Sequence, residues 1–175
     1  MNQILVAGIG NIFFGDDAFG VEVIRALREH PLPAGVRIED FGIRSYDLAY
    51  ALMDGYDAVI LVDATPRGQS PGTVSLIEPA LDGLETLPAE MTNAHGMNPA
   101  VALQLVHSMG GTIRRLYLVG CEPGILDTDE IALSPEVQAA IPHAVELIAS
   151  LVETLISATT SNAFPNETPE EVNLP

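Results

Sequence analysis

Strand-like apolar segments alternate with helical segments along this 175-residue chain, and the alternation constrains the fold more than any other feature. The clearest strand is DAVILVDA at residues 57–64, a β-branched run typical of a strand buried on both faces of a sheet. Just before it, SYDLAYALMDG at 45–55 predicts a helix with Ser45 as N-cap and Gly55 as C-cap. Strands separated by helices build a mostly parallel sheet covered by helices.

The complete pattern has the order β-α-β-α-β-β-α-β-α. It predicts an α/β fold, a three-layer sandwich with a twisted, mostly parallel five-stranded sheet flanked by helices. The segment at 72–79 alternates and carries polar residues, so we expect it at an edge of the sheet. The expected strands are 3–8, 36–42, 57–64, 72–79 and 114–120, and the expected helices are 18–29, 45–55, 98–110 and 134–156.

The length predicts a single domain, which we place at residues 1–157. Its last helix contains Pro142, which should kink or split it because proline removes a backbone donor and crowds the preceding turn. Residues 158–175 hold three prolines, several glutamates and no basic residue. This composition predicts a disordered acidic tail.

The charge and cysteine content point to one class of environment. The net charge is −17 and all seven basic residues are arginines, so the surface repels nucleic acid and anionic lipid. Cys121 is the lone cysteine, which excludes an internal disulfide and fits a reducing cytoplasm. The N-terminus resembles no signal peptide, and no stretch approaches the roughly 20 apolar residues of a membrane span. We therefore expect a cytoplasmic protein with neither a nucleic-acid nor a membrane partner.

The segment GIGNIFFGDDAFG, residues 8–20, begins like a dinucleotide-binding loop but departs from that pattern. Gly8 and Gly10 fit the spacing G-x-G-x-x-G, whereas the third glycine position holds Phe13. The adjacent acids Asp16 and Asp17 would oppose a pyrophosphate at the helix N-terminus. A P-loop is excluded because the chain has no lysine.

A dinucleotide- or phosphate-binding module remains an alternative, because Glu39 and Asp40 end the second strand where a ribose-binding acid could lie. The two acids of the loop also have structural interpretations. Asp16 could cap the following helix, and Asp17 could be a solvated acid of its first turn.

Three side chains follow strands or precede a helix at positions where α/β proteins build their sites. Asp17 follows the first strand, Asp63 ends the third, and His95 lies in the loop TNAHGMNP. Carboxylate and imidazole ligands suit a divalent cation such as Zn, Ni or Mn. Three protein ligands with an open position are typical of a catalytic or substrate-presented metal. Loop-capping roles for the aspartates and a polar loop role for His95 are the alternatives.

Four segments, in this order, resemble the [NiFe]-hydrogenase maturation endopeptidases: ILVAGIGNIFFGDDAFGVEVIRAL, YDAVILVDA with PGTV, AHGMNP and YLVGCEP. The resemblance covers about residues 3–155 and leaves the tail outside. It implies an α/β sandwich, and an enzyme that removes a C-terminal extension from the hydrogenase large-subunit precursor once nickel has been inserted. The cut in that family falls just after a cysteine motif that ends in a basic residue.

The resemblance also implies a site. Two acids and a histidine bind the nickel, or a surrogate divalent cation, and by position these are Asp17, Asp63 and His95. The same three residues are the expected catalytic groups, with nickel supplied by the substrate and no other cofactor. Asp16 matches an acid that precedes the ligand, and we expect it to orient the loop.

The chemistry of cleavage is less defined by the sequence. No Ser-His-Asp or Cys-His arrangement is visible, and the family's grouping with aspartic-type peptidases does not by itself establish an acid pair sharing a proton. A chaperone that holds the metal-loaded precursor without cutting it is a further alternative. A related peptidase of the same fold that acts on spore proteins fits the AHGMNP and VGCEP motifs less well.

Overall fold

The computed structural model describes residues 3–81, 99–124, 126 and 131–162. Its sheet confirms the predicted class, with strand order β2-β1-β3-β5-β4. β1 pairs in parallel with β2 and β3, β3 pairs in parallel with β5, and β4 runs antiparallel to β5. The strands are β1 (Ile4–Ile9), β2 (Val36–Gly42), β3 (Ala58–Ala64), β4 (Val74–Ile77) and β5 (Leu116–Cys121).

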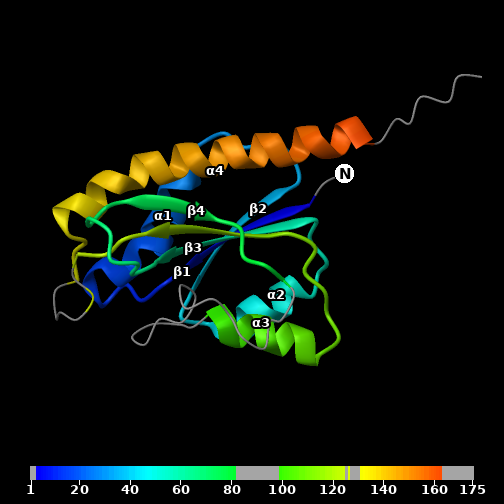
Figure 1. Ribbon diagram of the computed structural model, residues 1–175, viewed down its shortest axis with the longest axis horizontal. Helices are drawn as coiled ribbons and strands as arrows, with labels where there is room; N and C mark the ends of the chain where they lie inside the picture. Colours follow the sequence, from blue (N-terminus) through cyan, green and yellow to red (C-terminus); the bar gives the residue numbers. More distant parts are fainter. Residues whose placement is uncertain (1–2, 82–98, 125, 127–130, 163–175) are drawn as a thin grey trace, which may run out of the picture.

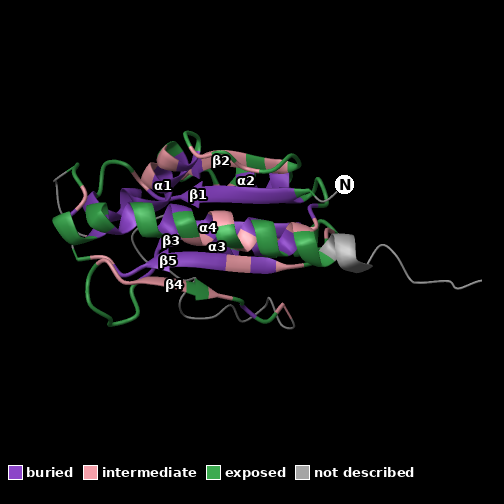
Figure 2. Ribbon diagram, turned by 90° about the horizontal axis from the view of Figure 1, so that it is seen from above, coloured by how far each residue is buried: buried purple, intermediate pink, exposed green. Residues whose placement is uncertain are grey.

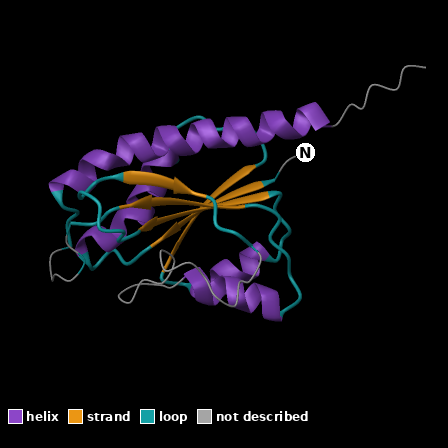
Figure 3. Cartoon of the chain, in the orientation of Figure 1, coloured by secondary structure: helices purple, strands orange, loops and turns teal. Residues whose placement is uncertain are grey.

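Helices cover both faces of the sheet and make the three layers (Figures 1 and 3). α1 and α4 pack together on one face, and α2 and α3 pack together on the other. A short 3-10 helix, η1, precedes α1 without a break. The helices are η1 (Gly15–Ala18), α1 (Phe19–Leu27), α2 (Ser45–Leu52), α3 (Pro99–Ser108) and α4 (Pro135–Asn162).

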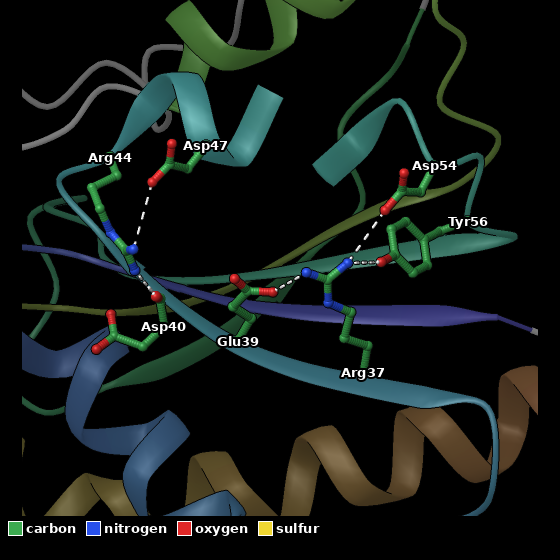
Figure 4. A network of polar contacts seen from close by, with 7 residues as sticks. All are labelled: Arg37, Glu39, Asp40, Arg44, Asp47, Asp54 and Tyr56. Carbon is green, nitrogen blue, oxygen red and sulfur yellow. Dashed lines mark hydrogen bonds and ion pairs between the residues drawn. The ribbon is translucent and has the colours of Figure 1, made fainter. Parts of the chain in front are cut away.

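Burial separates the central strands from the edges, as Figure 2 shows. β1 and β3 are buried at every position, which is why their sequences are continuously apolar. β2 and β4 are only partly buried, and the predicted edge position of β4 is confirmed. At the edge strand β2, Arg37 forms ion pairs with Glu39 and Asp54 and donates a 2.8 Å hydrogen bond to the Tyr56 hydroxyl (Figure 4). Charged side chains of this kind discourage another chain from pairing with an open edge.

Helix α4 differs from the expectation in two respects. Pro142 lies inside one continuous helix, so the expected split is wrong, while the expected kink stays a prediction. Pro142 is exposed, and so is Gln138, whose carbonyl loses its helical partner, so water can bind that carbonyl at little cost. The expectation that no stretch reaches membrane-spanning length is also wrong, because Pro135–Ala158 is long and apolar enough by composition. The buried side chains of this helix pack into the core beside α1, as in a core helix.

The limits of several elements shift by a few residues. α1 is preceded by the 3-10 turn η1, whereas a single helix from residue 18 was expected, and α2 ends at Leu52, three residues early. α4 continues to Asn162, past residue 157 where we placed the end of the domain. Residues 163–175 lie outside the described residues, so the disordered tail stays a prediction.

Helix α1 lies directly on the sheet at Gly20. A Cβ atom at this position would stand 2.1 Å from the carbonyl oxygen of Val62 and 2.2 Å from that of Ile9. Gly8 on β1 faces the same contact, since a Cβ there would lie 2.6 Å from the Gly20 carbonyl oxygen. Gly8 and Gly20 therefore let the backbone of α1 touch the carboxyl ends of β1 and β3. This contact positions the residues that lie between the two glycines in the chain.

Replacing Gly20 should destabilise the fold strongly. For Gly20→Ala we expect the free energy of unfolding to fall by about 3 kcal/mol, because the methyl group meets backbone atoms that cannot move aside. Gly68→Ala is the control: its φ of +76° is left-handed but no atom lies within 4 Å, so a loss of about 1 kcal/mol is expected. Denaturant unfolding measures both. A loss for Gly20→Ala no larger than for Gly68→Ala would contradict the contact.

Candidate active site

The candidate site lies where the strand order of the sheet reverses. From β1 the chain passes to β2 on one side and then returns to β3 on the other, so β1 and β3 are neighbours whose outgoing connections diverge. This point at the carboxyl ends of the strands is where open α/β sheets bind their ligands. Asp17 reaches this point from η1, and Asp63 reaches it as the second-last residue of β3.

The loop between β1 and η1 holds Asp17 through its backbone. Gly10 has φ of +133°, and a Cβ there would lie 1.8 Å from the carbonyl oxygen of Asp17, so only glycine allows this approach. The Asn11 N–H donates a 2.8 Å hydrogen bond to Oδ2 of Asp17. The Asp17 N–H donates in turn to the Phe14 carbonyl at 3.0 Å. The glycine spacing that suggested a nucleotide loop therefore shapes a cradle for a carboxylate.

Asp17 and Asp63 form a pair of buried like charges. They are 1% and 5% exposed, respectively. Burial, and then the negative charge of Asp17, raise the pKa of Asp63 well above its usual range, while a 2.8 Å hydrogen bond from the Ala64 N–H opposes the shift. Two carboxylates held in this way favour a shared proton or a cation, either of which relieves their repulsion.

The neighbouring Asp16 has a different task. Its Oδ1 accepts a 2.6 Å hydrogen bond from the Ser134 N–H, and its Oδ2 accepts from the Gly124 N–H at 2.8 Å and the Ser134 hydroxyl at 2.9 Å. It is fully buried. Asp16 is therefore neither the N-cap of η1 or α1 nor a solvent-exposed acid. It joins η1 to the segment after β5 and to the start of α4, which agrees with the expected role of orienting the loop.

Two further residues lie at the carboxyl end of β5 and are absent from the predicted site: Cys121, which ends the strand, and Glu122, which follows it. Cys121 is buried, and burial, followed by the charges of Asp16 and Glu122, raises its pKa to about 12. Glu122 accepts hydrogen bonds from the N–H groups of Arg67 (2.7 Å) and Gly68 (3.2 Å), so it fixes the loop after β3. The signal for Glu122 was available in the sequence, because an acid directly after a buried strand lies at the same edge as Asp63.

His95 lies outside the described residues, so its place beside the two aspartates stays a prediction. Within residues 3–81, 99–124, 126 and 131–162, no group of three His, Cys, Asp or Glu side chains could hold a metal ion. The described part of the chain therefore supplies two ligand candidates, Asp17 and Asp63.

The role of Asp16 can be tested by stability alone. Asp16→Asn replaces one acceptor oxygen by an amide that faces donors, so we expect the free energy of unfolding to fall by about 2–3 kcal/mol. Asp47→Asn is the matched control, because Asp47 is exposed and contacts Arg44 only at 3.5 Å, so a change within about 0.5 kcal/mol is expected. Equal effects in denaturant unfolding would show that Asp16 does not brace the loop.

Known proteins share both the sequence and the fold. The family model described as hydrogenase maturation protease matches residues 21–151, a range that includes Asp63 and begins after Asp17. A putative hydrogenase maturation protease from Methanocaldococcus jannaschii is 32% identical over 149 residues, covering 83% of this chain and 94% of that protein. The hydrogenase 2 maturation protease of Escherichia coli K12 is 34% identical over 162 residues, covering 89% of this chain and 94% of that protein.

The solved structure of the hydrogenase-maturating endopeptidase HybD from E. coli superposes with a TM-score of 0.74 at 29% identity. It covers 87% of this chain and 93% of HybD. The sequence matches extend over most of this chain and most of the relatives, and the same arrangement of sheet and helices carries them. The chain belongs to the hydrogenase maturation protease family, and it is a peptidase.

Proposed function

We infer that this peptidase removes the C-terminal extension from the large-subunit precursor of a [NiFe] hydrogenase, and that it recognises the nickel already bound in that precursor. Recognition of nickel is supported by the buried pair Asp17 and Asp63, which lies where the strand order of the sheet reverses. A buried pair of like charges is costly unless a proton or a cation lies between them. The metal ion of the substrate would supply that cation.

Each aspartate is oriented before any substrate arrives. One oxygen of Asp17 is fixed by the Asn11 N–H and one oxygen of Asp63 by the Ala64 N–H. In the proposed complex both carboxylates, together with His95, dock on the nickel, and so bring the scissile bond to the edge of the sheet. Nickel is thus part of the substrate, and other divalent cations would serve as surrogates. The docked metal could also polarise the carbonyl group or activate water.

Cleavage of the precursor tests this proposal directly. Purified precursor, with and without nickel, is incubated with the enzyme, and the mass of its C-terminal end is measured. We expect the wild type to cut only nickel-loaded precursor. For Asp17→Asn, Asp63→Asn and His95→Ala we expect the rate of cleavage to fall by about 100-fold or more. Undiminished cleavage by Asp17→Asn and His95→Ala would contradict the proposed site. Precursor that is bound but never shortened by the wild type would favour the chaperone alternative.

The substitution Asp63→Asn should not harm the fold. The raised pKa of Asp63 means that its ionisation opposes folding, so the stability that it contributes is present at acid pH and lost as the pH rises. At pH 7 we therefore expect Asp63→Asn to raise the free energy of unfolding, by about 1.4 kcal/mol for each unit of the pKa shift that lies below pH 7. Denaturant unfolding at pH 7 measures it. A fall in stability would show that the buried charge is compensated within the protein.

Cys121 is not expected to act as nucleophile. A thiol with a pKa of about 12 is protonated at neutral pH, and its buried sulfur lies 3.7 Å from the Glu122 carbonyl oxygen. We expect Cys121→Ala to cleave nickel-loaded precursor at a rate within about twofold of the wild type, with a stability loss of about 1 kcal/mol from the small cavity. A folded Cys121→Ala enzyme without activity would instead point to thiol catalysis.

The dinucleotide alternative now has less support. The glycines of the β1–η1 loop are explained by the approach of Gly10 to Asp17 and of Gly20 to the strands. Titration with nicotinamide and flavin cofactors, which we expect to give no binding, checks this point. A cytoplasmic location and the absence of nucleic-acid and membrane partners stay predictions.

A further inference from the structure

A groove opens beside the loop that holds Asp17, between that loop and the end of β2 with the residues that follow it. Its volume is about 250 Å³, and its walls include Asn11, Ile12 and Phe13 on one side and Asp40 and Ile43 on the other. The Gly10 N–H donates a 3.1 Å hydrogen bond to the Gly42 carbonyl, which ties the β1–η1 loop to the end of β2. The groove therefore borders the cradle that holds Asp17.

The rim of this groove exposes large apolar side chains on a fixed backbone. Phe13 is 62% exposed and Ile43 is 58% exposed, while Ile12 and Phe14 are exposed beside them. The Phe13 N–H donates to Oδ1 of Asn11 at 3.0 Å, and the Phe14 N–H donates to the Asn11 carbonyl at 3.2 Å. The turn itself is thus hydrogen-bonded, and its apolar side chains project from it. Clustered apolar exposure of this kind marks an interaction surface.

The carboxylate of Asp40 favours a basic group on whatever occupies the groove. Asp40 is half-buried, and its carboxylate makes no hydrogen bond or ion pair within the described part of the chain. Arg44 also lines the groove, but its guanidinium is turned to other partners: it donates to the backbone carbonyls of Asp40 and Phe41 and pairs with Asp47, as Figure 4 shows in part. The chain as a whole carries a net charge of −17. A basic group on the occupant would complement both the groove and its surroundings.

We propose that this groove holds the stretch of the hydrogenase precursor that flanks the cleaved bond, with an apolar side chain of that stretch between Phe13 and Ile43 and a basic group facing Asp40. This proposal rests on the proposed function, since it names where that substrate lies. A peptidase must hold an extended polypeptide next to its reacting groups, and this groove shares its loop with Asp17. The volume is smaller than the roughly 300–1,000 Å³ of small-molecule pockets, which suits side chains rather than a cofactor.

The groove also links binding to the position of the acid. Asn11 contributes one N–H to Asp17 and its side chain to the turn that carries Phe13. A substrate segment that contacts Phe13 thus rests on the same turn that orients the carboxylate. Phe13 and Ile43 are accordingly specificity-determining residues, whereas Asp17 and Asp63 are the groups that reach the metal. The two sets should separate in kinetics, because one governs binding and the other the reaction.

The experiment compares Phe13→Ser and Ile43→Ser with Leu76→Ser. Leu76 is an exposed apolar residue on β4, at the opposite edge of the sheet, and serves as the matched control. With nickel-loaded precursor we expect KM to rise about tenfold or more for each groove variant while kcat stays within about twofold, because a contact made equally in the bound ground state and in the transition state changes KM and leaves kcat unchanged. Leu76→Ser should match the wild type in both constants. Unchanged KM for both groove variants would overturn the proposal.

Binding without cleavage separates this proposal from the proposed function. Nickel-free precursor, which the wild type is expected to leave uncut, gives the Kd alone. A Kd raised about tenfold by Phe13→Ser supports the groove even if the wild type fails to cut nickel-loaded precursor, an outcome that would remove the proposed function. No difference in Kd or in KM would remove the groove while leaving cleavage intact.

Two further outcomes test the charge and the choice of partner. Asp40→Asn should raise the Kd about threefold or more at low salt and less at high salt, since the contact is electrostatic. A Kd equal to that of the wild type at low salt would overturn the charged part of the proposal.

Sedimentation tests a second copy of this chain as the occupant. A wild-type dimer that Phe13→Ser converts to a monomer, with KM unchanged, would assign the surface to self-association and overturn the proposal.

Discussion

The contact of Gly20 with the carbonyl oxygens of Ile9 and Val62 brings helix α1 onto the sheet at backbone distance. The chain between β1 and α1 then has little freedom, because both of its ends are fixed at the carboxyl edges of β1 and β3. Gly10 lets the Asp17 carbonyl pass close by, and the carboxylate of Asp17 is left beside Asp63. The buried acid pair is a consequence of close packing between a helix and two strands, and a single methyl group would disturb it.

Asp16 and Asp17 are neighbours in sequence with opposite environments. Asp16 accepts hydrogen bonds from three donors, two of them backbone N–H groups of segments more than 100 residues away in the chain. Asp17 faces another carboxylate, and its charge helps to raise the pKa of Asp63. The first residue thus stabilises the fold, and the second keeps an unfavourable interaction that a positively charged substrate group can relieve. Under the proposed function, this unfavourable interaction is retained because binding of the substrate's metal relieves it.

The apolar rim formed by Ile12, Phe13 and Ile43 extends the same principle from the metal to the polypeptide. Ile12 and Phe13 lie on the hydrogen-bonded turn at Asn11 and Ile43 follows β2, whereas Phe19 and Phe41 are buried in the core. In the proposed complex, exposure at this place, next to the acid pair, separates the task of holding a segment of substrate from the task of meeting its metal. The resulting site is an open edge of the sheet and not an enclosed pocket, which suits a macromolecular substrate.

Periodicity in the sequence determined the order of the elements, the mostly parallel sheet and the edge position of β4, because strand burial and helix amphipathicity depend on local residue patterns. It also determined that Asp17 and Asp63 reach one edge of the sheet, since the carboxyl ends of parallel strands meet there. Only the tertiary structure decided that Asp16 braces α4, that Pro142 is tolerated on the solvent side of that helix, and that Phe13 and Ile43 border one groove. Each of these depends on which distant backbone groups lie opposite a side chain, and local sequence patterns carry no information on that.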